Sequence, residues 1–229
     1  MRKTKWVKWI AGGLFAQVLA AAPINVMADG LEITEKNIIE FSGDDTAYFF
    51  ARVENNGTEP VSLARGKFVG VSESGELVVT SDFVSTMPSY ITLEPGQHVY
   101  AREYIWDSAL QDKNVAECIF SMDTREEGDA IVPVDCEVEK DFKGSLQNYI
   151  VVTFENTTDE IMYDYYITAV MHDDAGNLIF ADGDYIETWG IHPGSKVSAK
   201  VYVSNDFFDH YLEMGINVGD VEGQVFLCK

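Results

Sequence analysis

The residues of this chain that could carry out acid–base or nucleophilic catalysis are four histidines and many carboxylates. The histidines are His98, His172, His192 and His210. Hydrolysis by a nucleophile requires a serine or cysteine beside a histidine that a carboxylate orients, and no G-x-S-x-G or related motif links these histidines to one. We therefore predict solvated or edge histidines and a protein that is not an enzyme. A hydrolase, including a glycosidase with paired carboxylates, is the catalytic alternative.

Clusters of aspartate suggest calcium binding as a second chemistry. The candidate ligands are Asp173, Asp174, Asp182 and Asp184. Calcium needs about six to eight converging oxygen atoms, which a loop or a domain junction can supply. The EF-hand ligand series is absent, because Asp182-Gly183-Asp184 leads into Tyr185-Ile186. Solvated acidic turns are the favoured interpretation, a calcium site is the alternative, and no other cofactor is predicted.

Aromatic side chains provide a third candidate, because exposed rings can stack on sugars. The candidate ligand-binding residues are Tyr166, Tyr185 and Trp189. In the stretch 163–166, strand alternation turns Tyr166 away from the two tyrosines before it, so we expect Tyr166 to be the most accessible. Aromatic residues in strands usually pack into cores, and Trp106 and Trp189 stand at positions typical of core edges. For most of these residues we favour core packing over ligand contact.

The elements that carry these residues come in two copies, because the chain contains an internal duplication. Glu54-Asn55-Asn56-Gly57-Thr58-Glu59 returns as Glu155-Asn156-Thr157-Thr158-Asp159-Glu160. Further equivalent residues are separated by the same number of positions in the chain, and later ones by slightly fewer, because the second copy has a short deletion. They pair Val69, Gly75 and Leu77 with Val170, Gly176 and Leu178, and Pro95, Gly96, Val99, Ala101 and Tyr104 with Pro193, Gly194, Val197, Ala199 and Tyr202. A register kept over this length indicates one β-rich unit written twice.

Each copy has the pattern of strands joined by turns. In the second copy, period-two alternation over 161–172 is followed by a turn-forming stretch at 173–177 and another apolar run, which is typical of a β-hairpin. Pro-Gly turns follow in both copies, and short segments at 108–113 and 206–211 have the pattern of single helical turns. About seven strands per copy, with frequent turn signals, predict an all-β fold of two tandem immunoglobulin-like antiparallel β-sandwich domains.

The predicted organisation is a signal peptide at 1–28, a first β-sandwich repeat at 29–138 and a second at 139–229. Because no Gly/Ser-rich or Pro-rich linker separates the copies, we expect a short, stiff junction and two domains placed end to end. The three cysteines, Cys118, Cys136 and Cys228, are an odd number, which excludes a disulfide framework. A bridge between Cys118 and Cys136 is the alternative to three free thiols at apolar strand positions.

The order of these features resembles the FxLYD-type and related immunoglobulin-like domains of bacterial secreted and surface proteins. The matching positions are Val53, Asn55 and Gly57, then Asp174 and Gly176, then Leu93, Pro95 and Gly96, with Ile191, Pro193 and Gly194 in the second copy. His172 and Asp173 replace the Tyr-Asp pair of the family's hairpin, and the first copy has Ser72-Glu73 there. The resemblance implies a non-catalytic adhesion, scaffolding or binding module. Its motifs consist of turn and core residues, which indicate the fold and say little about the ligand.

The N-terminus and the charge indicate export. Four basic residues precede an apolar run, and Val26-Met27-Ala28 provides the small residues that signal peptidase recognises. Removing those four residues leaves 12 basic and 38 acidic residues, a net charge of −26. Such a chain repels phosphate, so we predict no nucleic-acid partner and no membrane insertion after signal cleavage.

The expected function follows from these points. We predict a bacterial protein that is secreted or associated with the cell surface and acts as a non-catalytic interaction, adhesion or scaffold module. Its partner would be a protein or a glycan. A carbohydrate-binding or calcium-binding module is the alternative, and a hydrolase is the least favoured interpretation.

Overall fold

The computed structural model describes residues 30–41, 45–143 and 147–228. The strands of the first half are β1 (Leu31–Glu40), β2 (Thr46–Asn55), β3 (Val61–Val71), β4 (Leu77–Met87), β5 (Ile91–Leu93), β6 (His98–Trp106), β7 (Glu117–Thr124) and β8 (Asp129–Val134). Those of the second half are β9 (Cys136–Phe142), β10 (Asn148–Glu155), β11 (Met162–Asp173), β12 (Leu178–Ile191), β13 (Lys196–Val203) and β14 (Val218–Cys228). The helical segments are η2 (Ser108–Gln111) and α1 (Asn205–Met214). The predicted signal peptide lies outside the described residues, and within them no helix is long and apolar enough to cross a membrane.

The duplication reappears in the hydrogen bonds of two buried asparagines, Asn55 and Asn156. Asn55 Nδ2 donates to the carbonyls of Glu59 and Leu93, both at 2.9 Å. In the second half, Asn156 Nδ2 donates to the equivalent carbonyls, those of Glu160 and Ile191, both at 2.8 Å. Buried polar groups need such partners, so each asparagine fixes the turn after its own strand to the residue before the Pro-Gly turn. The same local structure was therefore built twice.

The predicted hairpins and Pro-Gly turns are present. Gly75 and Gly176 occupy the same position in the β3–β4 and β11–β12 turns, with φ of 78° and 82°. Gly96 and Gly194, in the two Pro-Gly turns, have φ of 81° and 74°. These are left-handed conformations that glycine adopts without steric cost, which explains why glycine stands at each position.

The all-β class is confirmed, but the strands do not form two separate tandem sandwiches. Eleven strands form one mixed sheet in the order β1-β2-β6-β4-β3-β5-β8-β14-β11-β12, with β7 beside β3, while β13, β10 and β9 form a three-stranded sheet. Two strands cause this continuity. β4 pairs with β3 and, through residues 85–87, also with β6, and β8 pairs in parallel with β5 and antiparallel with β14. Hydrogen bonds therefore run from the first half into the second without a break.

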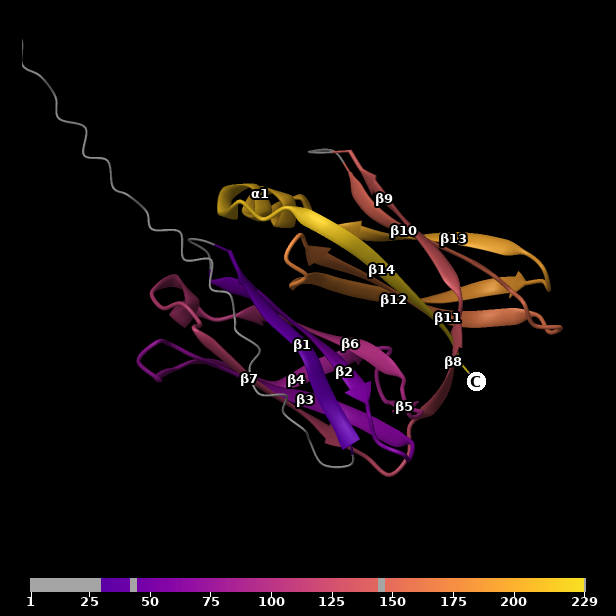
Figure 1. The fold of residues 1–229 in the computed structure, drawn as a ribbon, viewed down its shortest axis with the longest axis horizontal. Coiled ribbons are helices and arrows are strands. Elements are labelled where there is room, and N and C mark those ends of the chain that lie inside the picture. The colour runs from indigo at the N-terminus through magenta and orange to yellow at the C-terminus, as the bar shows by residue number, and fades with distance from the viewer. Residues whose placement is uncertain (1–29, 42–44, 144–146, 229) are drawn as a thin grey trace, which may run out of the picture.

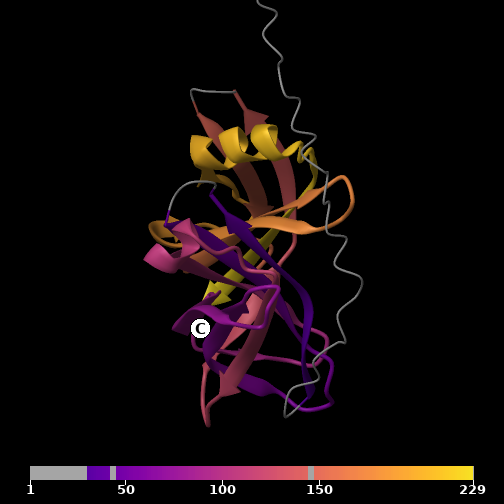
Figure 2. The ribbon, with the colours of Figure 1, turned by 90° about the vertical axis from the view of Figure 1, so that its left-hand side faces the viewer.

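The two halves lie face to face, where the sequence predicted an end-to-end arrangement. Figures 1 and 2 show the first-half strands, indigo to magenta, stacked against the second-half strands, orange to yellow. Along β2, alternate side chains point into the first half and towards the second. Phe49 packs against Phe68 inside the first half, with ring centroids 4.6 Å apart, whereas its neighbour Phe50 packs against Phe180 of β12 at 6.2 Å. Burial of this sheet face, a non-local effect, outweighs the stiff junction expected from the local sequence.

Helix α1 replaces the single helical turn predicted at 206–211. The Ser204 side chain caps its first turn by accepting from the amide of Asp206, and Gly215 ends it in a left-handed conformation. Phe207 of α1 is buried and lies 4.9 Å, centroid to centroid, from Tyr48 of β2. The helix therefore contributes to the contact between the halves.

The cysteines that the structure describes in full are free. Cys118 lies on β7 and Cys136 begins β9, and no disulfide joins them. The Cys136 thiol donates to the carbonyl of Gly223 on β14 at 3.3 Å. The bridge considered above is thus not formed, because the two cysteines lie on strands that pair with different partners.

Candidate functional site

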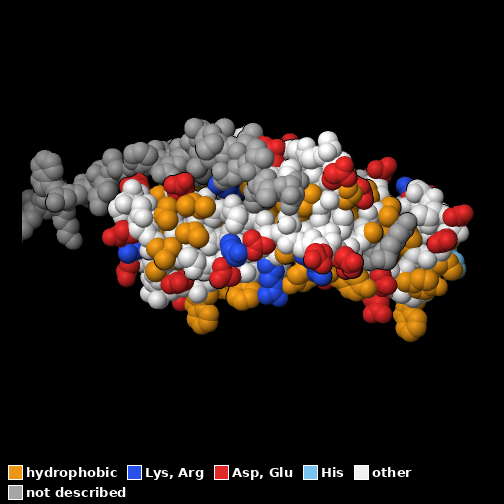
Figure 3. Space-filling model, turned by 90° about the horizontal axis from the view of Figure 1, so that it is seen from below, with side chains coloured by type: hydrophobic (Ala, Val, Ile, Leu, Met, Phe, Trp, Pro, Cys, Tyr) orange, Lys and Arg blue, Asp and Glu red, His pale blue; other side chains and the backbone are white. Residues whose placement is uncertain are grey.

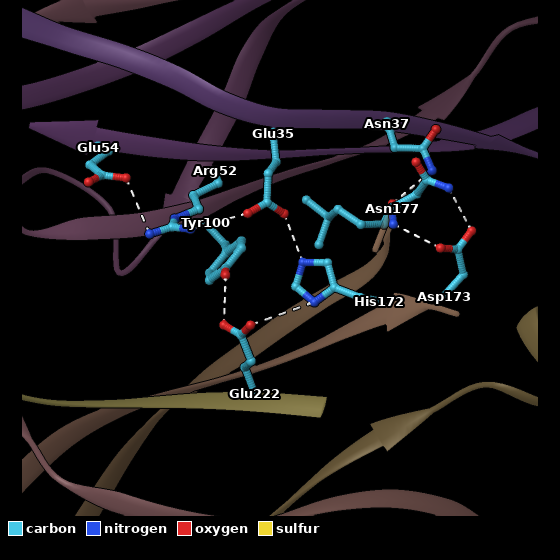
Figure 4. A network of polar contacts seen from close by, with 10 residues as sticks. Glu35, Asn37, Arg52, Glu54, Tyr100, His172, Asp173, Asn177 and Glu222 are labelled. Carbon is cyan, nitrogen blue, oxygen red and sulfur yellow. Dashed lines mark hydrogen bonds and ion pairs between the residues drawn. The ribbon is translucent and has the colours of Figure 1, made fainter. Parts of the chain in front are cut away.

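Charged and polar side chains form a connected network across the contact between the halves (Figure 4). His172 at the end of β11 is central: its Nε2 lies 2.8 Å from Glu35 Oε2 on β1 and its Nδ1 lies 3.8 Å from Glu222 Oε1 on β14. Tyr100 Oη on β6 donates to the second oxygen of Glu222 at 3.1 Å. Arg52 on β2 contacts the other oxygen of Glu35 at 3.2 Å. Five strands from both halves therefore meet in one network.

The electrostatics of this network follow from its geometry. The hydrogen bond to Glu35 raises the pKa of His172, an effect that burial partly opposes. Burial alone would raise the pKa of Glu35, but its hydrogen bonds with His172 and Arg52 lower it overall. Burial, reinforced by the nearby carboxylates, raises the pKa of Tyr100. Both members of the His172–Glu35 pair are thus stabilised in their charged forms.

The position of His172 corrects the prediction that it is a solvated or edge histidine. Only 7% of the residue is exposed, because the first half covers the end of the hairpin that carries it. In the described part of the chain, its polar contacts are with carboxylates, and it has no contact with a serine hydroxyl or a cysteine thiol. The arrangement is that of an ion-pair network that links two structural units.

Of the other histidines, His98 borders this network, with its ring centroid 5.8 Å from that of Tyr100, while His192 and His210 lie in a turn and on α1. His192 is exposed in its Pro-Gly turn, as predicted. His210 is buried on α1 beside Phe41, with ring centroids 5.3 Å apart, and burial lowers its pKa. His98 is half-buried at the start of β6, where burial also lowers its pKa and Gln224 donates to its carbonyl at 3.0 Å. Like His172, His210 is more enclosed than the sequence suggested.

The aromatic candidates fall into two groups. Tyr166 and Tyr185 face each other across β11 and β12, with ring centroids 5.1 Å apart. Tyr166, expected to be the most accessible, is half-buried against the core of the first half, because that half covers its sheet face. Trp189, expected at a core edge, is fully exposed, and Trp106 is 74% exposed. The prediction of core packing is therefore wrong for both tryptophans.

An exposed apolar surface at the open end of the β11–β12 hairpin is made up of Ile161, Tyr163 and Trp189, which strand pairing brings near one another. The side chains of Ile161 and Tyr163 are 40% and 52% exposed, whereas that of Trp189 is fully exposed and projects into solvent. Gly190 lies beneath the first two, since a Cβ at Gly190 would stand 2.7 Å from Ile161 Cγ2 and 3.2 Å from Tyr163 Cε1. A hollow of about 440 Å³ borders this surface and is lined by residues 158–164 and Leu227. Seen from below, hydrophobic side chains project among acidic ones (Figure 3).

Sequence reasoning missed this surface, although one signal was present. The pairing of β11 with β12 is irregular between residues 162 and 164, and Gly190 has φ of 118°. A glycine near the end of a strand is typical of a bulge, and a bulge re-aims the side chains next to it. The exposed series Tyr185, Glu187 and Trp189 ends at this glycine, and Ile191 beyond it is buried.

The acidic candidates have separate roles in the structure. Asp173 Oδ1 accepts from the amides of Ala175 and Asn177 at 2.9 and 2.8 Å and so stabilises the hairpin turn. Asp182 forms an ion pair with Arg102 of β6, across the contact between the halves. Asp174 and Asp184 are exposed. Within the described ranges, no group of three or more His, Cys, Asp or Glu side chains is arranged to hold a metal ion.

Comparisons with known proteins give no family. No family model matches the chain, and no curated protein is similar to it. Among solved structures, red sea bream transglutaminase is 12% identical over 85% of this chain and 29% of its own length, with a TM-score of 0.28. Bacteroides uniformis β-glucuronidase 2 is 9% identical over 70% and 22%, with a TM-score of 0.22, and the C-terminal globular domain of the Pyrococcus abyssi oligosaccharyltransferase is 9% identical over 88% and 48%, with a TM-score of 0.23. The chain spans less than half the length of each, and the FxLYD-type resemblance stays a prediction.

Proposed function

We propose that this chain is an exported, non-catalytic interaction module in which two immunoglobulin-like repeats are stacked into one body. It binds its partner outside the cell through the surface formed by Ile161, Tyr163 and Trp189. The observation that carries the proposal is the full exposure of the Trp189 side chain. A tryptophan is costly to leave in water, and exposed apolar clusters with a polar border are typical of interaction sites.

The contact between the halves supports a binding role for the whole body. The ion pairs Glu35–His172 and Arg102–Asp182 and the packing of Phe50 on Phe180 hold the halves in one orientation. A fixed orientation means that a partner which contacts both halves would meet them without the entropic cost of ordering a flexible linker.

Saccharide binding is the second candidate function, and one feature favours it. The hollow beside Ile161 and Tyr163 is also lined by Asp159, Glu160 and Asp164. Aromatic rings can cover the apolar face of a sugar while carboxylates accept hydrogen bonds from its hydroxyl groups. The ligand would be a neutral saccharide, because an anionic one would be repelled by these carboxylates.

Intrinsic fluorescence offers a direct test. After removal of the predicted leader, the chain contains two tryptophans, Trp106 and Trp189, so that Trp106→Phe leaves Trp189 as the sole reporter. This variant is titrated with a panel of neutral oligosaccharides and with surface proteins of the producing cell. We expect at least one ligand to change the Trp189 emission. Calorimetric titration with that ligand should show that Trp189→Ala weakens its binding by roughly tenfold or more.

Trp106→Ala is the matched control, because Trp106 is also exposed but lies on β6 of the first half. Binding that Trp106→Ala reduces as much as Trp189→Ala would contradict the assignment of the surface. Unchanged Trp189 emission across both panels would contradict the proposed function.

A further inference from the structure

A second cluster lies in the first half, where three exposed side chains, those of Arg65, Phe83 and Arg125, surround the half-buried Tyr90 in the segment between β4 and β5. Arg65 Nε on β3 donates to Tyr90 Oη at 2.7 Å. The guanidinium carbon of Arg125, which follows β7, lies 5.2 Å from the centre of the Tyr90 ring. Phe83 of β4 lies under the guanidinium of Arg65 at 5.1 Å. Two strands of the first half and two connecting segments therefore bring two cations and two rings together.

The two arginines of this cluster differ from the other described arginines in having no carboxylate partner. Arg52 pairs with Glu35 and Glu54, and Arg102 pairs with Asp182. For Arg65 and Arg125, no carboxylate oxygen lies within 4.0 Å among the described residues. In a chain of net charge −22, two exposed guanidinium groups left without acidic partners are unexpected on charge alone. The N–H groups of these two guanidinium groups are available to donate hydrogen bonds to an anion.

The cluster is held in place before any ligand arrives. Tyr90 has φ of 59°, a left-handed conformation that is unfavourable for a bulky residue and occurs mainly where the surroundings enforce it. The carbonyl of Tyr90 accepts from the amide of Asp129 at 2.9 Å, and the amide of Arg125 donates to the carbonyl of Ser62 at 3.0 Å. Gly128 allows this close packing, because a Cβ there would lie 2.7 Å from the backbone of Ile91.

The chemistry of these groups defines the ligand. A guanidinium stacked on an aromatic ring keeps its in-plane N–H groups free for a carboxylate, which it can bind through two parallel hydrogen bonds. The exposed Phe83 ring adds an apolar surface beside the cation. Because the remainder of the chain is strongly acidic, a ligand with one isolated carboxylate is favoured over a polyanion.

We infer that Arg65, Arg125, Tyr90 and Phe83 form a binding site for a saccharide that carries a single carboxylate, with Arg65 and Arg125 as donors to the carboxylate and its neighbouring hydroxyl groups and Phe83 in contact with the ring face. This site lies in the first half and is separate from the surface around Trp189. The inference goes beyond the proposed function and does not depend on it.

Calorimetric titration of the exported chain tests the inference with three probes: a disaccharide that contains one uronic acid, its carboxyl-reduced neutral form, and a short peptide with one glutamate. We expect the uronic acid to bind, with an affinity that decreases with added salt, and the other two to bind at least roughly tenfold more weakly. Equal binding of the acid and its reduced form, or no binding of either, would overturn the site. Equal binding of the peptide would overturn the assignment to a saccharide.

Arg65→Gln should weaken binding of the uronic acid by roughly tenfold or more. Lys67→Gln is the matched control, because it removes the same charge from an exposed residue on the same strand that is paired with Asp123. Arg125→Gln gives an independent test should Arg65→Gln fold poorly, and an equal effect of the control and both arginine variants would refute the site. Trp189→Ala should leave binding of the uronic acid unchanged, which separates this inference from the proposed function.

Discussion

His172 Nε2 lies 2.8 Å from Glu35 Oε2, so the end of β11 in the second half is joined by an ion pair to β1, the first strand of the first half. The two residues are far apart in the sequence, and their contact exists only when the halves are stacked. Glu222 and Arg52 extend the contact on either side. The state of this pair therefore reports on the contact between the halves.

The first prediction concerns the pH dependence of stability. Because the hydrogen bond to Glu35 raises the pKa of His172 above 6.5, the stabilisation by this histidine is complete below pH 6.5 and is lost as the pH rises through its folded-state pKa. The pKa of Glu35 is lowered from 4.5, so its contribution is present above pH 4.5 and is lost as the pH falls through its folded-state pKa. Urea unfolding across pH 4 to 9 should show the largest stabilisation by the His172–Glu35 pair between pH 4.5 and pH 6.5.

His172→Gln isolates this contribution, because it removes the titratable group and keeps a side chain that can contact Glu35. The difference in unfolding free energy between wild type and variant should decrease as the pH rises above neutrality. His98 and His210 act in the opposite direction, since burial lowers the pKa of both, but they are present in both proteins and cancel. A difference that does not change with pH would contradict a charged His172.

The second prediction concerns the duplicated asparagines. Asn55→Ala and Asn156→Ala should each lower the free energy of unfolding by about 2–3 kcal/mol, because each removes an amide that donates to two backbone carbonyls. The loss at Asn156 should be the smaller one, because the Thr158 hydroxyl also donates to the carbonyl of Glu160. Asn56→Ala, at an exposed neighbouring position, should change stability by less than about 0.5 kcal/mol. Equal effects of all three substitutions, measured by urea unfolding, would contradict the role of the buried amides.

The third prediction concerns the packing between the halves. Phe50→Ala should cost about 3–5 kcal/mol, the range for a fully buried phenylalanine, and so should Phe180→Ala. The double variant should lose less than the sum, with a coupling of about 0.5–3 kcal/mol, because the two rings contact each other. Phe49 and Phe180 face different cores and form the control pair, for which additive losses are expected. Additivity in both pairs would argue against face-to-face stacking in solution.

The fourth prediction concerns thiol reactivity. Burial raises the pKa of Cys118 to about 12, so very little thiolate is present near pH 8. In a variant with Cys136→Ser and Cys228→Ser, the reaction of the folded chain with an aromatic disulfide reagent should be at least about 100-fold slower than in urea. A chain that keeps only Cys136, which is less buried, should react faster when folded. Rapid reaction of Cys118 in the folded chain would show that β7 opens readily.

Local structure could be predicted from the sequence because the signals for it are local. The hairpin turns at Gly75 and Gly176, the Pro-Gly turns and the equivalence of Asn55 and Asn156 each depend on a few adjacent residues and on the internal duplication. All-β architecture followed from the same pattern. These features are present as expected.

The arrangement of the halves and the candidate sites could not be predicted in this way. The stacking depends on β4 sharing two partners and on β8 bridging β5 and β14, which are pairings between distant segments. His172 is enclosed only because of that stacking. Trp189 lies on the exposed face with Tyr185 and Glu187, and the strand register shifts between that series and Ile191, which is buried again.

The position of β14 has a consequence for folding. β14 follows the other described strands in the sequence, yet it lies inside the sheet between β8 and β11. The seam between the repeats therefore cannot close before β14 has been synthesised, and until then the edges of β8 and β11 are available to other strands. A chain without β14 would keep two unsealed repeats prone to aggregation.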